Sequence, residues 1–317
     1  MGYQDVTLLL GNPYFLPRFS HAVACFCLPA SGAERLSTTF NSKTLEQSLQ
    51  IEGTAGHYEV RLSKAWEIWG PNGGYLAALA LRAAGMQCEI RRPASIYCQF
   101  LSSPKFDVVE LEVTALRKRR RTEAWSVQMR QAGEPVLQAL VRTAATAAGP
   151  AHQVTMPQVP KPEQLKGYWE LWPDSPGQQL PFWSNIEGRT IDQSVSVEPR
   201  SGPRRDWARF QPQACFDDPF LDAARYLILL DTWGWPALHS MYPDADFIAP
   251  SLDVSVWFHD FGSASQWLLI EHESPIAAHG LVGVAGKVWS QDGRLLATGG
   301  AQLCCLPISP DTVAGKA

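Results

Sequence analysis

Hydrophobic residues recur at a helical spacing between Gly74 and Ala84, and the spacing predicts a helix there. The stripe at positions i, i+3, i+4 and i+7 consists of Leu76, Leu79, Ala80 and Ala83. The opposite side is also small and apolar, and carries Ala77, Ala78 and Ala84. A helix that is apolar all round is a buried one. We therefore expect a sheet to curl closely around this helix, although an ordinary core helix of another α+β fold remains the alternative.

The pattern of elements occurs twice along the chain. The first helix is followed by about four segments with strand patterning, and a second predicted helix, from Pro219 to about Thr232, is followed by about four more. The last hairpin of each set has a glycine at its turn, Gly133 and Gly293. A long helix before a run of antiparallel strands indicates an α+β fold. Chance similarity of two β-rich segments is the alternative to a duplication.

These patterns divide the chain into two units joined by a linker. We expect an N-terminal unit over residues 48–148 and a C-terminal unit over residues 205–308. Between them, residues 149–204 are rich in proline and glycine, which is typical of a linker with local docking. Residues 1–47 are expected to be an irregular lead-in, and residues 309–317 a tail.

Composition narrows the class of protein without identifying it. A hydrophobic content of 45% and a charged content of 18% describe a globular protein rather than a disordered one. The net charge of -4 gives no general attraction to nucleic acid or to an anionic membrane. Seven cysteines without framework spacing suggest reduced thiols. Since no apolar segment is long enough to span a bilayer, we expect a cytoplasmic protein without stable membrane insertion.

Four segments together resemble the acyl-CoA thioesterase II-like family of the double hotdog thioesterase superfamily. They are "GPNGGYLAALALRAA" in the first unit and "LLDTWGWPA", "PSLDVSVWFHDF" and "SQDGRLLATGGAQL" in the second. The resemblance implies a double hotdog fold, in which two helix-wrapped antiparallel sheets form a pseudo-dimer. It also implies hydrolysis of a fatty acyl-CoA thioester by activated water, without a cofactor, and further association into homo-oligomers.

Asp231 is the first candidate catalytic residue. It ends the helical segment "RYLILLD", where Leu227 and Ile228 place it on the apolar face, whereas Asp222 lies half a turn away and is expected to be solvated. Desolvation raises a carboxyl pKa towards the range of a general base. The alternative is a carboxylate bonded to backbone near the helix end. The resemblance implies that Asp231 orients the attacking water.

The resemblance implies that Ser251, at the start of "SLDVSVWF", helps to position the water. Strand alternation places Ser251 on the face opposite Leu252 and Val254. A turn residue at a strand start is the alternative interpretation. The third polar residue of the family, a Gln, should fall at residue 301.

Residue 301 is Ala301, however, and Gln302 is one position further along. A slip of one residue turns a strand side chain to the opposite face. Either a bulge near the glycine pair 299–300 returns Gln302 to the site, or the third polar group is missing. The second case would favour the alternative function, a non-catalytic protein that binds acyl-CoA or lipid.

The backbone N–H groups of Gly74 and Tyr75 are the expected oxyanion donors. The first N–H groups of a helix have no intrahelical partner, and the helix N-terminus carries a partial positive charge. Glycine leaves the approach free of side chains, so these groups could hold the oxyanion of a thioester under attack. A tight turn with close helix–sheet packing is the alternative interpretation.

The remaining candidates are weaker. Arg119 and Arg121 belong to the run "RKRRR", which indicates either a solvated hairpin loop or a site for the phosphates of CoA. No spacing of His, Cys or Glu residues indicates a metal site, and no Gly-x-Ser-x-Gly sequence indicates a serine hydrolase. A hotdog hydratase is disfavoured because its Asp-x-Asn-Pro-x-His pattern is absent.

Overall fold

A computed structural model describes residues 43–192, 202–243, 247–262 and 264–307. The predicted lead-in, as far as residue 42, and the predicted tail lie outside these residues. No helix in the described ranges is long and apolar enough to cross a membrane.

From residue 43 onwards, the N-terminal half contains two α-helices, a 3-10 helix and six strands. In chain order they are α1 (Leu45–Ser48), β1 (Glu52–Thr54), β2 (His57–Arg61), η2 (Lys64–Trp66), α2 (Gly73–Gln87), β3 (Pro93–Phe100), β4 (Val108–Lys118), β5 (Thr122–Gln131) and β6 (Glu134–Ala144). The connection that follows contains η3 (Pro162–Gln164), α3 (Tyr168–Leu171), η4 (Pro176–Gln179) and η5 (Pro181–Ser184).

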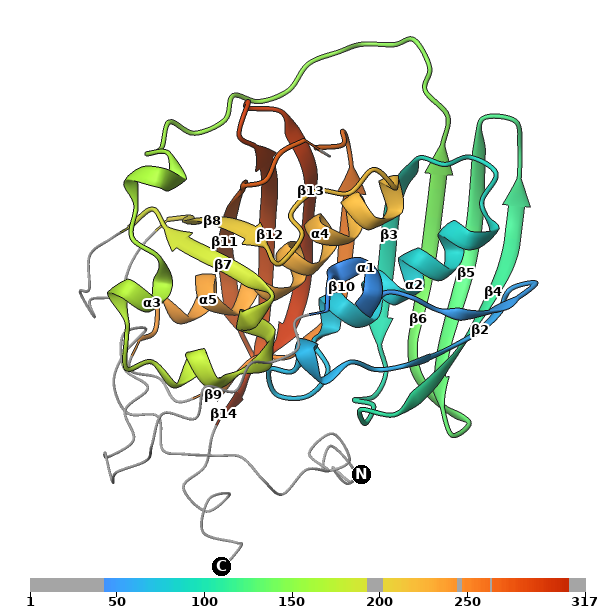
Figure 1. The fold of residues 1–317 in the computed structure, drawn as a ribbon, viewed down its shortest axis with the longest axis horizontal. Coiled ribbons are helices and arrows are strands. Elements are labelled where there is room, and N and C mark those ends of the chain that lie inside the picture. Colours follow the sequence, from blue (N-terminus) through green and yellow to red (C-terminus); the bar gives the residue numbers. More distant parts are fainter. Residues whose placement is uncertain (1–42, 193–201, 244–246, 263, 308–317) are drawn as a thin grey trace, which may run out of the picture.

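The C-terminal half begins with two strands before its long helix. Its elements are β7 (Ile186–Thr190), β8 (Arg204–Phe210), α4 (Pro219–Thr232), α5 (Gly234–His239), β9 (Phe247–Ile248), β10 (Ser251–Phe258), β11 (Leu268–Ala278), β12 (Leu281–Ser290), β13 (Leu295–Cys304) and β14 (Leu306–Pro307). Figure 1 shows the two halves side by side, with β3 and β10 at their junction.

One antiparallel sheet of 12 strands runs through both halves. Its strand order is β1-β2-β4-β5-β6-β3-β10-β13-β12-β11-β8-β7. The second half of this order repeats the first in reverse, so β10 corresponds to β3, β13 to β6, and β12 to β5. The two halves join where β10 pairs with β3. The predicted double hotdog fold is confirmed, and in the structure the two sheets are joined into one continuous sheet.

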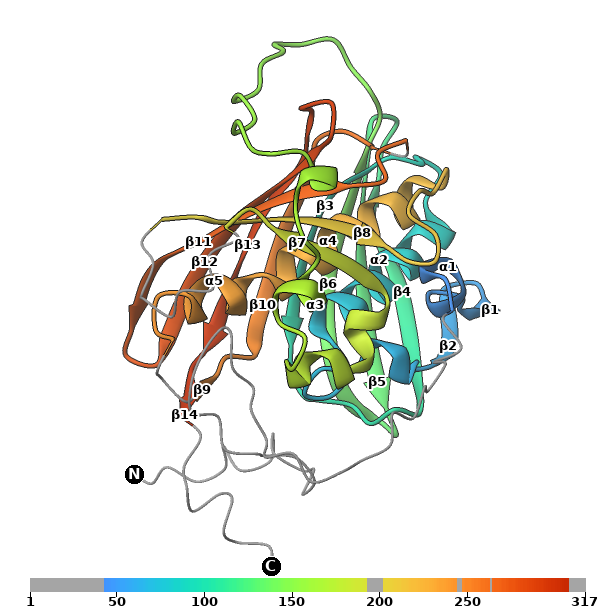
Figure 2. The same cartoon turned by 60° about the vertical axis from the view of Figure 1, so that its left-hand side comes forward.

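Helices α2 and α4 pack against each other on one face of the sheet, and Figures 1 and 2 show them side by side. They run antiparallel, because Gly74 lies against Ile228 at one end while Gly85 lies against Phe220 at the other. A Cβ added to Gly74 would lie 2.7 Å from the Ile228 Cα, so only glycine permits this approach. The small residues of α2 therefore serve helix–helix packing as well as the expected packing on a sheet.

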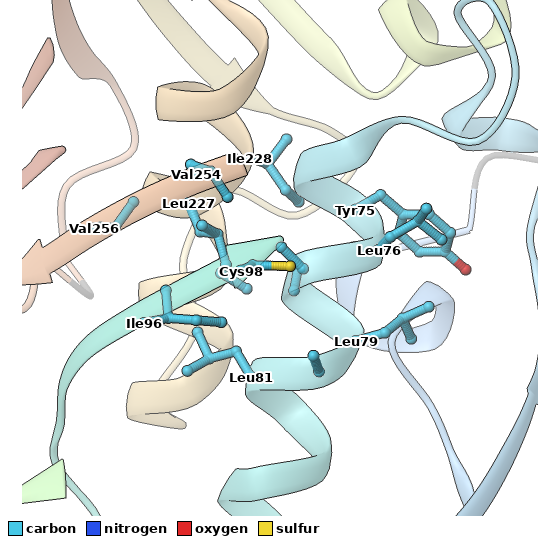
Figure 3. Packing of buried hydrophobic residues seen from close by; sticks show 14 of the residues in the cluster. Tyr75, Leu76, Leu79, Leu81, Ile96, Cys98, Leu227, Ile228, Val254 and Val256 are labelled. Carbon is cyan, nitrogen blue, oxygen red and sulfur yellow. The ribbon is translucent and has the colours of Figure 1, made fainter. Parts of the chain in front are cut away.

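The interior between the two helices and strands β3 and β10 is apolar. Figure 3 shows side chains from all four elements meeting there, among them Leu81, Ile96, Cys98, Leu227, Ile228, Val254 and Val256. All seven are buried. This shared core makes the two units one folding body, because neither helix could bury its apolar surface without the other.

The Pro-rich connection is more ordered than a linker, because it adds β7 to the sheet edge through pairing with β8. Upstream of β7, Leu165 packs on Trp207, Leu269 and Trp289 in a second apolar cluster. These three residues alternate with core residues along their strands, so the cluster covers the sheet face away from α4. The C-terminal sheet therefore begins before residue 205, the predicted boundary of the unit.

Asp222 is buried, which corrects the expectation that it is solvated. Only 1% of its surface is exposed, and its carboxylate is paired with Arg225. It also accepts hydrogen bonds from the Tyr226 hydroxyl, at 2.5 Å, and from the N–H of Gly262, at 3.0 Å. The helical pattern correctly placed Asp222 away from Asp231, but the loop that carries Gly262 covers that side of the helix.

Candidate active site

The two units meet at a direct contact between the start of α2 and the end of α4. The N–H of Gly74 donates a hydrogen bond of 2.6 Å to Oδ2 of Asp231. Glycine is required on the α2 side, because a Cβ on Gly74 would lie 3.1 Å from the Asp231 Cβ. The helix N-terminus, with its partial positive charge, is thus held against the only side-chain carboxylate of the last turn of α4.

Asp231 lies in an environment suited to a general base. Its exposed fraction is 6%. Burial raises the pKa of Asp231 to about 6, while the nearby Ser251 hydroxyl and the Gly74 N–H act to lower it. The other carboxylate oxygen, Oδ1, has no partner in full hydrogen-bonding geometry among the described residues, although the Ser251 hydroxyl is near enough to lower the pKa of Asp231. A carboxylate that titrates near neutral pH and has a free oxygen can both orient a water molecule and take its proton.

Ser251 reaches this site because β10 contains a bulge. Ser251 pairs with Leu303 and Asp253 pairs with Gln302, so β10 has one more residue than β13 between these pairs. The extra residue, Leu252, reverses the alternation along β10. Paired residues of antiparallel strands point to the same side, and Leu303 is buried. Ser251 therefore lies on the inner face, the same face as Val254. Strict alternation along the strand had predicted that these two residues lie on opposite faces, so that prediction is corrected.

Gln302 lies away from the site. It is exposed, while its neighbours Ala301 and Leu303 are buried on the face that packs against the helices. Pairing between β10 and β13 is regular from Asp253 to Phe258, so the glycine pair 299–300 forms no bulge. The structure thus does not bring Gln302 to Asp231, and the inner position belongs to Ala301.

The two expected oxyanion donors already have acceptors within the protein. The N–H of Gly74 donates to Asp231, and the N–H of Tyr75 donates to Oδ1 of Asn72 at 2.9 Å. Asn72 is the N-cap of α2, and the sequence signal for this role is an Asn directly before the first helical residue. Its side chain also donates a 3.0 Å hydrogen bond to the Thr232 hydroxyl. Sequence reasoning singled out neither Asn72 nor Thr232 as site residues.

The predicted phosphate-binding arginines lie far from Asp231. Arg119 and Arg121 are exposed in the turn between β4 and β5. That turn adjoins the C-terminal end of α2, because Glu123 accepts hydrogen bonds from the N–H groups of Glu89 and Ile90. With 15 residues, α2 is ~20 Å long. The turn is therefore about one helix length from the site, and phosphate binding there stays a prediction.

The opposite end of the helix pair shows no second site of this kind. Counting from the N-cap of each helix, Phe220 of α4 corresponds to Gly74, and Gly85 of α2 corresponds to Asp231. The Phe220 ring lies against Gly85, and the Arg91 guanidinium stacks over this ring with its carbon 4.6 Å from the centroid. A glycine and an aromatic ring thus replace the carboxylate and its donor. The two ends of the helix pair are thus equivalent in backbone position but differ in the side chains that they carry.

Among the described residues, no group of three or more His, Cys, Asp or Glu side chains is arranged to hold a metal ion. Besides the Asn72–Thr232 pair, the functional groups near Asp231 are the Ser251 hydroxyl, backbone amides and the buried thiol of Cys98. Burial and the charge of Asp231 both raise the pKa of that thiol. A thiol kept protonated in this way is a poor nucleophile, so Asp231 is a better candidate than Cys98 for the reactive group of the site.

We predict that Gly74→Ala destabilises the protein by about 1–3 kcal/mol, because the added methyl group forces the two helices apart. Urea unfolding followed by far-UV circular dichroism would measure the change. Gly149→Ala is the matched control, since no described atom lies within 4 Å of a Cβ added there. Equal stability of Gly74→Ala and wild type would contradict the close helix contact.

Comparisons with known proteins agree with this architecture. The model of the acyl-CoA thioesterase N-terminal domain matches residues 62–147, and that of the C-terminal domain matches residues 157–306. Human acyl-coenzyme A thioesterase 8 is 27% identical over 287 residues, which cover 83% of this chain and 86% of the relative.

Many solved structures share the fold, and two examples have low sequence identity to this chain. The acyl-CoA thioesterase II TesB2 from Mycobacterium marinum is 21% identical with a TM-score of 0.68, and the match covers 84% of this chain and 98% of that one. A hot dog fold protein of unknown function from Alicyclobacillus acidocaldarius is 22% identical with a TM-score of 0.71, at the same coverage. Since the two matched domains together span more than half of the sequence, the chain belongs to the acyl-CoA thioesterase family.

Proposed function

We propose that this protein hydrolyses an acyl-CoA thioester to a free acid and CoA, with Asp231 as the residue that activates water. The observation that carries the proposal is the buried Asp231 carboxylate, held through Oδ2 by the Gly74 N–H while Oδ1 has no partner among the described residues. Family membership supports the substrate class, since the relatives are acyl-CoA thioesterases.

The proposed reaction needs no covalent enzyme intermediate. A water molecule donates a hydrogen bond to the free Oδ1 of Asp231 and attacks the thioester carbonyl carbon. The carboxylate takes a proton from this water as the new carbon–oxygen bond forms. When the tetrahedral intermediate collapses, the carbon–sulfur bond breaks and the thiolate of CoA receives the proton back from Asp231. Ser251, on the same inner face, helps to orient the water.

Oxyanion stabilisation by the N–H groups of Gly74 and Tyr75 stays a prediction. For this role the substrate carbonyl has to compete with Asp231 for the first group and with Asn72 for the second. The positive end of α2 acts on a developing oxyanion in either case, because its partial charge arises from the whole first turn.

The alternative function is binding of acyl-CoA or lipid without hydrolysis. The specific observation in its favour is that Ala301 occupies the inner position where the family pattern places a Gln, while Gln302 faces outwards. The proposed mechanism assigns water activation to Asp231 and Ser251 alone.

Release of free CoA thiol, followed with a chromogenic thiol reagent over a series of acyl chain lengths, tests the proposal. Thiol release that saturates with substrate and depends on enzyme concentration would support it. Saturable binding of acyl-CoA, measured by calorimetry, without thiol release at any chain length would instead support the binding function.

We predict that Ser251→Ala lowers kcat roughly tenfold, because the hydroxyl that helps to position the water is lost. Ser251 lowers the pKa of Asp231, so the acid limb of the pH–rate profile should also move to higher pH. Gln302→Ala is the matched variant on the outer face and should stay within about twofold of wild type. Initial rates between pH 5 and 8 would distinguish the two; a large loss in Gln302→Ala alone would reverse the assignment.

The five described cysteines are free thiols, namely Cys88, Cys98, Cys215, Cys304 and Cys305. Free thiols support the expected cytoplasmic location, because oxidising compartments favour disulfides. Association into homo-oligomers also stays a prediction, supported by the exposed side chains of Tyr97, Leu140 and Trp257 on the sheet face away from α2 and α4.

A further inference from the structure

We infer that the hydrogen bond between Asn72 and Thr232 is a clamp that positions Asp231 for the reaction. The inference rests on the proposed function of Asp231. It assigns positioning roles to two residues, one from each unit, that make no contact with the reacting atoms in the mechanism above.

The geometry of the clamp follows from the order of residues in the two helices. The Asn72 side chain uses both ends of its amide: Oδ1 accepts from the Tyr75 N–H, and Nδ2 donates to the Thr232 hydroxyl. Thr232 directly follows Asp231 and is the last residue of α4. The clamp and the Gly74–Asp231 contact are therefore two adjacent hydrogen bonds between the same two helix ends.

The clamp lies where α4 ends, with only Trp233 between this helix and α5. Within the C-terminal unit, Trp233 anchors this end of α4, because its side chain is buried and its indole N–H donates a 2.9 Å hydrogen bond to Asp206. The Asn72–Thr232 bond ties the final residue of α4 to the cap of α2, and Asn72 has an exposed fraction of only 7%. Fixing Thr232 fixes the preceding residue, so the Asp231 carboxylate keeps one orientation towards Gly74. Small displacements of a catalytic group are costly, since about 1 Å can reduce turnover a hundredfold.

The clamp is a hydrogen bond between two neutral side chains, which suits a position beside a carboxylate whose pKa has to stay high. At the other end of the helix pair, the α4 cap Asp218 is bound to α2 by a salt bridge with Arg82, at 2.5 Å. A cation beside Asp231 would stabilise the carboxylate and lower its pKa. A neutral Asn–Thr bond joins the helices without that effect, so the pKa of Asp231 remains governed by burial.

Thr232→Val tests the clamp, because valine keeps the shape of threonine but cannot accept the hydrogen bond, and the cap of α2 is left intact. We expect kcat to fall roughly tenfold with little change in KM. Thr232→Ser, which keeps the hydroxyl, should retain most of the activity. In an Asp231→Asn background, Thr232→Val should lower the residual rate no further, because the clamp acts only through Asp231.

An NMR titration tests the clamp without relying on activity. The sequence has Gly-Gly pairs only at 73–74 and 299–300, so glycine labelled with 13C at the carbonyl and with 15N gives carbonyl-selected amide signals for Gly74 and Gly300 alone. The Gly74 signal should titrate with a midpoint near the Asp231 pKa of about 6, lose this titration in Asp231→Asn, and titrate with reduced amplitude in Thr232→Val. Gly300, on β13, is the internal control.

The outcomes separate the two proposals. A wild-type protein that releases no thiol would overturn the proposed function, while the titration would still report on the clamp. Normal kcat and an unchanged Gly74 titration in Thr232→Val would overturn the clamp. So would equal loss in Thr232→Ser and Thr232→Val, or a further loss of rate in the Asp231→Asn background, since each points to a general structural effect.

Discussion

Asp231→Asn should lower the turnover of an acyl-CoA at least about a hundredfold, which corresponds to roughly 3 kcal/mol of barrier. Asparagine has nearly the same shape and can still accept the hydrogen bond from Gly74, so the contact between the two helices is preserved. It cannot take a proton from water. The loss should therefore fall on kcat, with little change in KM if KM reflects substrate binding.

The same substitution should stabilise the folded protein at neutral pH. Burial raises the pKa of Asp231 from 3.8 to about 6, so between about pH 4 and 6 the folded state holds a proton that the unfolded state has released. The stability from this protonated carboxyl is fully present below about pH 4 and is lost as the pH rises through about 6. Above that pH the charged carboxylate costs on the order of 2–3 kcal/mol. Asparagine has no such cost.

Kinetics and chemical unfolding on one pair of variants check both effects. Thiol release by wild type should decline below about pH 6, as the carboxylate is protonated. The difference in unfolding free energy between Asp231→Asn and wild type should grow between about pH 4 and 6. Asp217→Asn, an exposed carboxylate just before α4, is the control and should change neither quantity. An Asp231→Asn enzyme with wild-type kcat would remove Asp231 from the mechanism.

The fold and the family could be predicted from the sequence because their signals are local and repeated. The helix period after Gly74, the hairpin turns and the duplicated order of elements each follow from nearest neighbours along the chain. Asp231 could be proposed as a candidate for the same reason, since the helical period places it on a buried face, as the structure shows. In each case the hydrophobic periodicity that predicts a helix or strand also predicts which of its faces packs against the core.

Which side chains reach the site depends on strand register and on contacts between distant segments, and local sequence patterns do not report either of these. The bulge at Leu252 brings Ser251 to the inner face, yet no glycine or proline in β10 marks it. The glycine pair 299–300 carries a stronger bulge signal, but it pairs regularly. Register between strands is set by tertiary packing. Likewise, Asp222 is buried by loops that are distant in sequence, so the period of its own helix could not reveal its surroundings.

The partial charge and the bare backbone of the α2 N-terminus indicate an anion site, as the sequence suggested. In the structure, the anion is the Asp231 carboxylate of the other unit. Glycine at position 74 satisfies two requirements together, because it lets α4 approach and leaves the N–H open to Asp231. A substrate oxyanion would be a second acceptor for the Gly74 N–H and would compete with Asp231 for it. This arrangement links the stability of the contact between the two units to the protonation state of Asp231, the proposed catalytic carboxylate.

Arg225→Met should destabilise the protein by about 3–5 kcal/mol, the typical cost of breaking a buried ion pair from one side. Arg225 is fully buried and paired with Asp222. It also donates to the carbonyl oxygens of Ala214, at 2.5 Å, and Ser265, at 3.0 Å. Methionine fills much of the space but leaves these carbonyls and the Asp222 charge without a donor, and each unpaired buried group adds to the cost.

Urea unfolding of three variants measures this contribution. Arg120→Met, in the exposed turn after β4, should stay within about 0.5 kcal/mol of wild type. The double variant Asp222→Asn with Arg225→Met should recover part of the loss, because no unpaired charge is left buried. A single Arg225→Met variant as stable as wild type would show that the loops around residues 214 and 265 hold α4 without the guanidinium. Because α4 carries Asp231, loosening these loops should also lower turnover, which connects a network remote from the chemistry to the position of the carboxylate.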